Sequence, residues 1–156
     1  MVDEILPATR RGFLTAAGGL ALVTVLPMPE GHATPASMAA AIKKVVGDKP
    51  LRKGKVKLDV PPIVENGNTV ALEVAVESPM TAGDHVKAIH VFNEKNPQPN
   101  IVSVRMGPRS GRAQLSTRVR LADSQNLIAI AEMSDGTFWT DDVEVIVTIA
   151  ACLETP

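Results

Sequence analysis

The sequence predicts an all-β protein, a β-sandwich of about seven strands preceded by one short helix. Beyond residue 55 apolar residues recur at every second position in short runs, and proline, glycine and asparagine separate these runs. A chain of 156 residues has room for one domain, and its aromatic content of 3% requires an aliphatic core. The net charge of −1 argues against nucleic acid or an anionic membrane surface as a partner.

The N-terminal residues are typical of an export signal. Arg10 and Arg11 precede a moderately apolar stretch at residues 16–26, an order that predicts a twin-arginine signal peptide. The stretch is shorter than the roughly 20 residues that span a bilayer, and the small residues at 31–33 suit cleavage. We therefore expect residues 1–33 to be removed and the mature protein to lie in the bacterial periplasm, away from the membrane. An uncleaved membrane anchor is the alternative.

A short amphipathic helix is predicted at residues 37–46. Ser37 is the candidate N-cap and Gly47 the stop. Apolar residues recur at intervals of three and four, at Met38, Ala41, Ile42 and Val45. Residues 34–53 are thus expected to be a helix and a linker, and the basic connector at 51–55 is expected to be solvated surface.

The sandwich is predicted to occupy residues 54–149. Its seven strands are expected at 56–60, 69–77, 86–93, 101–106, 114–121, 126–133 and 137–149. The second and fifth strands alternate apolar and polar residues, so each has one solvated face. The last strand is longer than the usual five or six residues, and we expect it to bend or to run past the sandwich. Residues 150–156 follow it as a mobile tail.

The tail contains the only cysteine of the chain, Cys152, flanked by Ala150, Ala151 and Leu153. A leftover cysteine in an exported protein indicates a reactive thiol or an intermolecular disulfide. The thiolate is the nucleophile in disulfide and persulfide exchange, so this position suits a covalent cargo. A small apolar residue closing the last strand is the remaining interpretation.

Other candidate site residues carry weaker signals. Arginines gather at Arg105, Arg109, Arg112, Arg118 and Arg120, where they could steer an anion or dock an acidic partner, or form an ordinary solvated surface. His85 and His90 fall on opposite faces of a strand, so no metal is predicted. The acidic residues at 141–144 are interpreted as a charged hairpin face. The proline-bearing loop at 93–99 could shape a partner interface or simply join two strands.

Six segments carry a family resemblance. They lie at residues 54–61, 63–70, 78–81, 91–99 (ending Asn-Glu-Lys-Asn-Pro-Gln-Pro), 107–113 (Gly-Pro-Arg-Ser-Gly-Arg-Ala) and 134–139 (Ser-Asp-Gly-Thr-Phe-Trp). Together these segments resemble SoxY, the sulfur-carrier subunit of the periplasmic thiosulfate-oxidizing system, over nearly all of the mature chain.

The resemblance implies an immunoglobulin-like β-sandwich that forms a heterodimer with a small β-protein of the SoxZ type. It also implies a non-catalytic carrier, without a cofactor of its own, that serves separate enzymes. A haem enzyme would join thiosulfate to the thiol, a hydrolase would release sulfate, and a sulfane dehydrogenase would oxidise the remaining sulfur. By position, Cys152 is the residue that would hold the cargo.

The tail departs from the Gly-Gly-Cys-Gly pattern of that family. Ala150 and Ala151 stiffen the segment, since glycine is more permissive, and Leu153 adds bulk beside the sulfur. Glu154 places an anion near a thiol that would meet an anionic substrate. The alternative function is therefore a SoxY-like scaffold that keeps the heterodimer but carries no sulfur. A third hypothesis, an enzyme with Cys152 as its own nucleophile, has no histidine placed to serve it.

Overall fold

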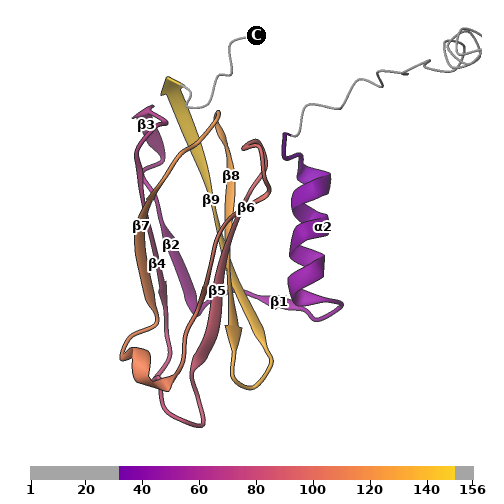
Figure 1. Ribbon diagram of the computed structural model, residues 1–156, viewed down its shortest axis with the longest axis vertical. Coiled ribbons are helices and arrows are strands. Elements are labelled where there is room, and N and C mark those ends of the chain that lie inside the picture. Colours follow the sequence, from indigo (N-terminus) through magenta and orange to yellow (C-terminus); the bar gives the residue numbers. More distant parts are fainter. Residues whose placement is uncertain (1–31, 150–156) are drawn as a thin grey trace, which may run out of the picture. The chain divides into compact units, whose positions relative to one another are not determined.

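Two β-sheets face each other in the computed structural model, which describes residues 32–149 (Figure 1). The larger sheet has the order β1-β9-β8-β5-β6, with β3 also paired to β9, and the smaller sheet has the order β2-β4-β7. The strands are β1 Leu51–Arg52, β2 Val56–Asp59, β3 Ile63–Asn66, β4 Val70–Val76, β5 Val86–Asn93, β6 Asn100–Arg105, β7 Gln114–Val119, β8 Gln125–Met133 and β9 Phe138–Ile149. The predicted all-β sandwich is confirmed.

The main core is aliphatic and lies between the two sheets. Val70, Leu72, Val74 and Val76 alternate with more exposed residues along β4 and face the larger sheet. Leu127 on β8 is among the fully buried residues that face them. Period-two alternation thus places one apolar face of each sheet inward, as the sequence predicted.

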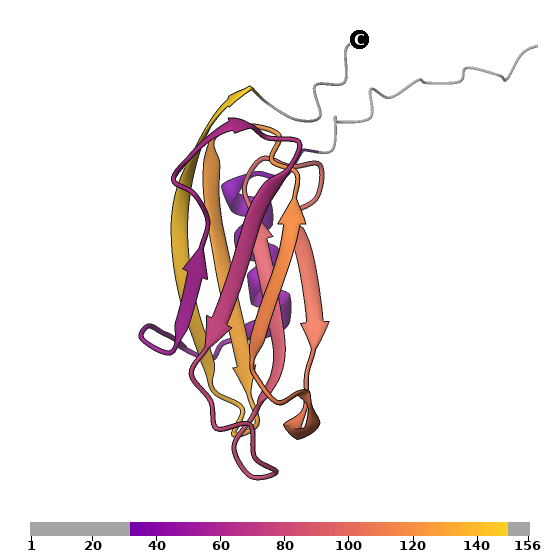
Figure 2. The ribbon, with the colours of Figure 1, turned by 90° about the vertical axis from the view of Figure 1, so that its left-hand side faces the viewer.

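Helix α2, Pro35–Val46, packs on the outer face of the larger sheet, away from the smaller one (Figure 2). Its buried residues Met38 and Val46 join Phe92, Ile130 and Phe138 in a second apolar cluster. Two of the chain's three phenylalanines are therefore used under the helix rather than between the sheets.

The helix begins earlier than predicted because Thr34, and not Ser37, is its N-cap. The Thr34 hydroxyl accepts from the Ser37 backbone N–H over 3.1 Å, and the Ser37 hydroxyl accepts from the Thr34 N–H over 2.8 Å. Pro35 fits the first helical position because its fixed φ suits a helix and no donor is needed there. Gly47, with φ of +67°, ends the helix as predicted.

Strand β9 is the longest strand of the larger sheet, and two short strands that the sequence did not predict pair with it. Its 12 residues pair antiparallel with β8, and parallel with β1 and β3. The β8 ladder ends at Val145, and β9 then continues along β3 as far as Ile149. The last strand thus runs past the end of β8, but it does not run past the sandwich up to Ile149, because β3 pairs with it there.

The basic connector is only partly the solvated surface that we expected. Leu51 and Arg52 form β1, and the Arg52 guanidinium and the Lys55 ammonium lie 5.9 and 5.1 Å from the centre of the Trp139 ring. Cations above an indole face gain a cation–π interaction, so this segment is held against β9. Within residues 32–149 no helix is long and apolar enough to cross a membrane.

Candidate functional site: the base of the C-terminal tail

Cys152 and its neighbours Ala150, Ala151 and Leu153 lie outside the described residues. The structure does describe Ile149, the last residue of β9, from which the chain continues into the tail. We call residues 146–149, with the residues that bind them, the tail base. Its geometry determines where the cysteine segment starts on the folded body.

Hydrogen bonds hold the tail base on two sides. The Gly67 N–H donates to the Ile149 carbonyl oxygen over 2.8 Å, and the Thr148 hydroxyl donates to the Val64 carbonyl oxygen over 3.1 Å. On the other side the Ser124 hydroxyl accepts from the Val147 N–H over 2.9 Å. The end of β9 therefore has a fixed position although the β8 ladder stops at Val145.

A hydrogen-bond network around the Asn96 side chain connects to the tail base. The Asn96 side-chain amide donates to the Arg120 carbonyl oxygen over 2.8 Å, and its oxygen accepts from Ala122 N–H and Gln125 Nε2 over 2.9 and 3.0 Å. The next residue along, Leu121, donates its N–H to the Gly67 carbonyl oxygen over 2.9 Å. An unbroken run of hydrogen bonds and short backbone steps thus links Asn96 to the end of β9.

The loop at 93–99 is held by hydrogen bonds within itself. The Asn93 side chain is fully buried, donates to the Gln98 carbonyl oxygen over 2.7 Å and accepts from the Asn96 N–H over 2.8 Å. Buried amides remain stable only when their donors and acceptors are satisfied, and here both are. Sequence reasoning identified this loop but not its link to the tail, because the residues involved lie more than twenty positions apart.

The predicted arginine group is divided between the two ends of the sandwich. Arg109 lies in the short helix η1, Pro108–Ser110, and Arg112 follows it, at the end of the sandwich opposite the tail base (Figure 1). Arg118 on β7 and Arg120 just after it lie towards the tail base. Arg105 is the last residue of β6, so the five predicted arginines do not form one cluster.

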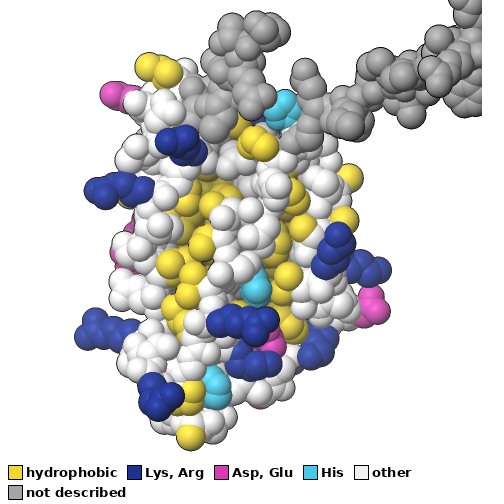
Figure 3. Space-filling view, in the orientation of Figure 1, with side chains coloured by type: hydrophobic (Ala, Val, Ile, Leu, Met, Phe, Trp, Pro, Cys, Tyr) yellow, Lys and Arg dark blue, Asp and Glu magenta, His cyan; other side chains and the backbone are white. Residues whose placement is uncertain are grey.

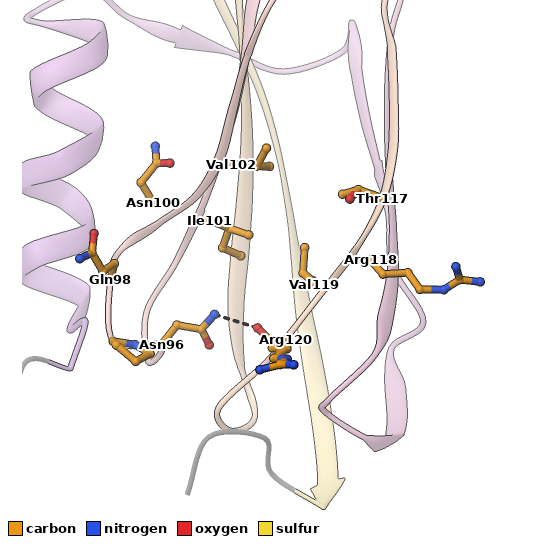
Figure 4. Close-up of a pocket in the computed structure, with 10 residues that line it drawn as sticks. Asn96, Gln98, Asn100, Ile101, Val102, Thr117, Arg118, Val119 and Arg120 are labelled. Atoms are coloured by element: carbon orange, nitrogen blue, oxygen red, sulfur yellow. Dashed lines mark hydrogen bonds between the residues drawn. The ribbon is translucent and has the colours of Figure 1, made fainter. Parts of the chain in front are cut away.

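A groove of about 450 Å³ runs between β6 and β7, the edge strands of the two sheets. Ile101 and Val102 of β6 and Val119 of β7 give it apolar walls (Figure 4). Asn96 and Arg120 lie at one end of it, joined by their hydrogen bond, whereas Arg118 points away from the groove. Hydrophobic side chains gather in the middle of this face, with Lys and Arg side chains around them (Figure 3).

The histidines have separate surroundings. Nδ1 of His85 lies 3.1 Å from the Thr81 carbonyl oxygen, and Nδ1 of His90 lies 2.8 Å from the Ser103 hydroxyl. Burial lowers the pKa of His90, against the opposing effect of the Glu132 carboxylate. Among residues 32–149 no three His, Cys, Asp or Glu side chains gather in a way that could hold a metal ion.

The acidic residues after Trp139 serve the fold. The Asp141 carboxylate accepts from the Leu58 N–H over 2.9 Å, which joins β2 of the smaller sheet to β9 of the larger one. Asp142 forms an ion pair with Lys53. The predicted charged face is therefore present for Asp142, while Asp141 makes a cross-sheet contact that no local pattern indicates.

Residues 42–152 match the family model described as "Sulfur oxidation protein SoxY". Among solved structures, the sulfur carrier protein SoxY from Chlorobium limicola f thiosulfatophilum is 28% identical, with a TM-score of 0.60, over 73% of this chain and 98% of that chain. Comparison with curated protein sequences gives no match.

Superoxide reductases share the fold alone. The neelaredoxin from Ignicoccus hospitalis is 20% identical with a TM-score of 0.54, over 74% of this chain and 94% of that chain. A putative superoxide reductase from Thermotoga maritima is 19% identical with a TM-score of 0.53, over 62% and 93% of the two chains. The sandwich is of the immunoglobulin-like type that the resemblance implied, and because the family match covers well over half of its length, the chain belongs to the SoxY family of sulfur oxidation proteins.

Proposed function

We propose that this protein is a non-catalytic carrier that holds thiosulfate-derived sulfur covalently on Cys152 while separate enzymes act on it. Membership of the SoxY family supports the proposal, and the observation that carries it is that the matched segment runs through Cys152. The solved relative at 28% identity is described as a sulfur carrier protein. The cysteine needs no other thiol in the chain for this role.

The chemistry requires a thiolate and external enzymes. Oxidative joining of thiosulfate to the Cys152 thiolate forms an S–S bond and releases two electrons, which a haem partner accepts. Hydrolysis then consumes one water, releases sulfate and two protons, and leaves a persulfide. Three waters and the loss of six electrons to a dehydrogenase convert that persulfide into an S-sulfonate. A second hydrolysis releases sulfate and restores the thiolate, which can react again because thiolates are the nucleophiles of sulfur exchange.

The folded body gives the segment that contains Cys152 a fixed starting point. The tail base is fixed by Gly67, Ser124 and Thr148, so the tail starts from a defined point. A fixed base followed by a short segment confines the thiol to a small volume around that point, which raises its effective concentration at a docked enzyme. We infer that the partners are a SoxZ-type β-protein, which forms the heterodimer, and the haem enzyme, hydrolase and dehydrogenase of the same system.

We further propose export to the periplasm by the twin-arginine route, with residues 1–33 removed. Cleavage after Ala33 leaves Thr34, the N-cap of α2, as the first residue, so the helix keeps the capping bonds to Ser37. Mass spectrometry of protein from a periplasmic extract tests this boundary. A chain that begins at residue 1 in the membrane fraction would contradict it and favour the uncleaved anchor.

Intact-mass measurement tests the carrier function directly. Protein purified with its β-partner from thiosulfate-grown cells is expected to carry thiosulfate or sulfane adducts, and Cys152→Ala protein is expected to carry none. Cys152→Ser, which keeps a similar shape without the thiol, is the matched control for heterodimer formation. A bare thiol under these conditions, in protein that still pairs normally, would overturn the carrier proposal.

Leu153 favours one second candidate, the scaffold that pairs but carries nothing. Its side chain adds bulk next to the sulfur where the family pattern has glycine. If the scaffold is correct, wild-type protein forms no adduct when it is supplied with the system's own enzymes, and Leu153→Gly, which removes the bulk, restores adduct formation. If the carrier is correct, wild-type protein already forms the adduct with those enzymes.

A further inference from the structure

Positive charge is concentrated in one stretch of the chain, residues 43–57. The stretch contains seven lysines and arginines and a single acidic residue, Asp48, whereas the whole chain has 16 basic and 17 acidic residues. Within the described part of the chain two of these seven cations form ion pairs, Lys43 with Asp48 and Lys53 with Asp142. The surface made by this stretch therefore keeps a net positive charge, from Lys44, Lys49, Arg52, Lys55 and Lys57.

Three of these cations are held against the first residues of β9. The Lys49 ammonium lies 5.4 Å from the centre of the Phe138 ring and donates to a backbone carbonyl oxygen of the β8–β9 hairpin over 3.1 Å. The Arg52 guanidinium and the Lys55 ammonium lie 5.9 and 5.1 Å from the centre of the Trp139 ring. Because a cation gains a favourable interaction over an aromatic face, these three charges have defined positions on the surface.

One acid of the hairpin offsets these charges only in part. Arg52 and Lys55 lie against the same ring, so solvent and salt do not fully screen their mutual repulsion. The Asp135 carboxylate already accepts from the Thr137 N–H and hydroxyl, over 2.8 and 2.7 Å. These bonds are the main cause of its lowered pKa, and Lys55 and Arg52 lower it less. A carboxylate supplied by another molecule would therefore be attracted to this place.

An apolar hollow of about 390 Å³ lies beside the three cations, where α2 ends and β1 begins. Ile42 and Val46 of the helix and Leu51 of β1 line it together with Lys49. Leu51 is 39% exposed, although it is a large apolar residue. Protein interfaces commonly have an apolar centre that accepts one side chain and a polar rim around it. The hollow and its neighbouring cations have these two parts.

This surface lies far from the tail base. Strand β1 pairs with Phe138 and Trp139, the first two residues of β9, and Ile149 is ten residues beyond Trp139, about 33 Å along the strand. Figure 1 shows β1 and the end of α2 well away from the free end of β9. A molecule bound at β1 would thus leave the tail base uncovered.

We call Lys49, Arg52, Lys55 and the hollow the basic edge. We propose that the basic edge docks an acidic protein surface, whose carboxylates lie beside the three cations and whose protruding aliphatic side chain enters the hollow. The proposal goes beyond the carrier function, because none of these groups takes part in sulfur attachment. Cys152→Ser is therefore expected to bind such a partner as the wild type does, and either proposal can fail while the other stands.

A protein fits the basic edge better than a lipid bilayer does. A helix that lies on a membrane exposes its apolar face, whereas α2 buries Met38 and Val46 on the larger sheet. The hollow is concave, so it accepts a side chain from a partner and inserts none of its own. A bilayer is accordingly the rival that the test has to exclude.

The test uses Trp139 as the reporter, because it is the only tryptophan of the chain and lies within the basic edge. The probe is the peptide Glu-Asp-Leu-Glu-Glu, blocked at both ends, and the comparison peptide has alanine in place of leucine. The leucine peptide is expected to change the Trp139 emission until it saturates. Its affinity is expected to fall about tenfold when the salt concentration is raised to roughly 0.5 M, since the charges are exposed.

Three variants separate the parts of the basic edge. Leu51→Ser is expected to weaken binding of the leucine peptide about fourfold and to leave the alanine peptide unaffected, because the hollow then has no apolar wall to offer. Lys49→Gln is expected to weaken both peptides about twofold. Arg118→Gln removes an exposed cation of β7, outside the basic edge, and is the matched control that should change neither affinity.

Each contrary result has a definite meaning. Equal affinities for the leucine and alanine peptides, or an equal loss in Arg118→Gln and Lys49→Gln, would leave only diffuse charge attraction and overturn the docking site. Binding seen by calorimetry without a change in Trp139 emission would place the peptide elsewhere. Vesicles with one phosphatidylglycerol for every two phosphatidylcholines provide the last arm. If they bind more tightly than the leucine peptide, and Leu51→Ser abolishes that binding, the basic edge faces a membrane and the proposal is wrong.

Discussion

The Ser124 hydroxyl accepts a hydrogen bond from the backbone N–H of Val147 over 2.9 Å and lies 3.4 Å from the Val147 carbonyl oxygen, to which it donates. The pair lies where β9 leaves β8, whose ladder ends with Gln125 opposite Val145. Beyond the β8 ladder, the Ser124 side chain thus takes the place of a neighbouring strand as the hydrogen-bond partner of the Val147 backbone. This contact keeps the last residues of β9 in line on the side that faces β8.

Ser124→Ala is expected to destabilise the fold by about 1–2 kcal/mol, because it leaves the buried Val147 N–H without its acceptor. Urea unfolding gives the free energy, and hydrogen exchange is expected to quicken at residues 146–149. Ser116→Ala, on the exposed face of β7, is the control and should change stability by less than about 0.5 kcal/mol. Unchanged exchange in Ser124→Ala would show that β3 alone holds the tail base.

Asn96→Ala is expected to cost about 2–3 kcal/mol of unfolding free energy. The substitution removes one donor and one acceptor that serve Arg120, Ala122 and Gln125, and it leaves partly buried groups unsatisfied. Asn100→Ala on exposed β6 is the matched control and should be nearly neutral. If both variants unfold at the same urea concentration, the network does not stabilise the body.

Asp141→Ala is expected to destabilise the sandwich by about 1.5–3 kcal/mol, since the carboxylate accepts a partly buried N–H from Leu58 in the opposite sheet. Asp141→Asn keeps an acceptor and should recover most of the loss. Asp142→Ala removes only an exposed ion pair to Lys53 and should cost less than Asp141→Ala, because solvent screens such a pair. A larger loss in Asp142→Ala than in Asp141→Ala, measured by urea unfolding, would reverse this ranking.

The stability of the protein is expected to fall as pH drops below about 6.5 because of His90. Burial lowers the pKa of His90 in the folded state, so the unfolded chain takes up a proton first. Unfolding free energy therefore rises with pH between the folded and unfolded pKa values and falls on acidification. His90→Gln, which retains a partner for Ser103, is expected to flatten this dependence in urea titrations from about pH 7.5 to 5.5.

Two aspartates, Asp123 and Asp135, provide a check on the assignment of this pH dependence to His90. Lys95 lowers the pKa of Asp123, and the Thr137 backbone N–H lowers that of Asp135. Stability from these two groups is lost only below the ordinary range for aspartate, well outside the window for His90. An equal slope in wild type and His90→Gln between pH 7.5 and 5.5 would remove His90 from the explanation.

Local patterns predicted the seven main strands because each is bounded by turn residues and alternates within itself. The predicted bounds of β5, residues 86–93, match the observed strand, whereas the ends of the other strands moved by a residue or two. Strands β1 and β3 were missed, since parallel pairing with β9 involves residues far along the chain and leaves no alternation in β3. The helix start was misplaced because Thr34 and Ser37 share one capping box.

Composition indicated the cysteine as the candidate site, but not the structure from which it extends. The tail base depends on contacts such as Ser124 with Val147 and Asn96 with Arg120, which join residues 23 and 24 positions apart. Strand spacing predicted the outward side of Arg118, whereas the position of Arg109 follows from a turn at the other end of the sandwich. Contacts between residues so far apart in the chain cannot be inferred until the fold is known.

The pairing of β9 with β3 and its contact with Ser124 have a mechanical consequence for any pull on the end of this strand. A pull on Ile149 is directed along the strand, so it shears the bonds to β3 and the contact with Ser124 at the same time instead of unzipping them singly. The strand should therefore resist extraction. Force applied at Ile149 leaves the sheet intact.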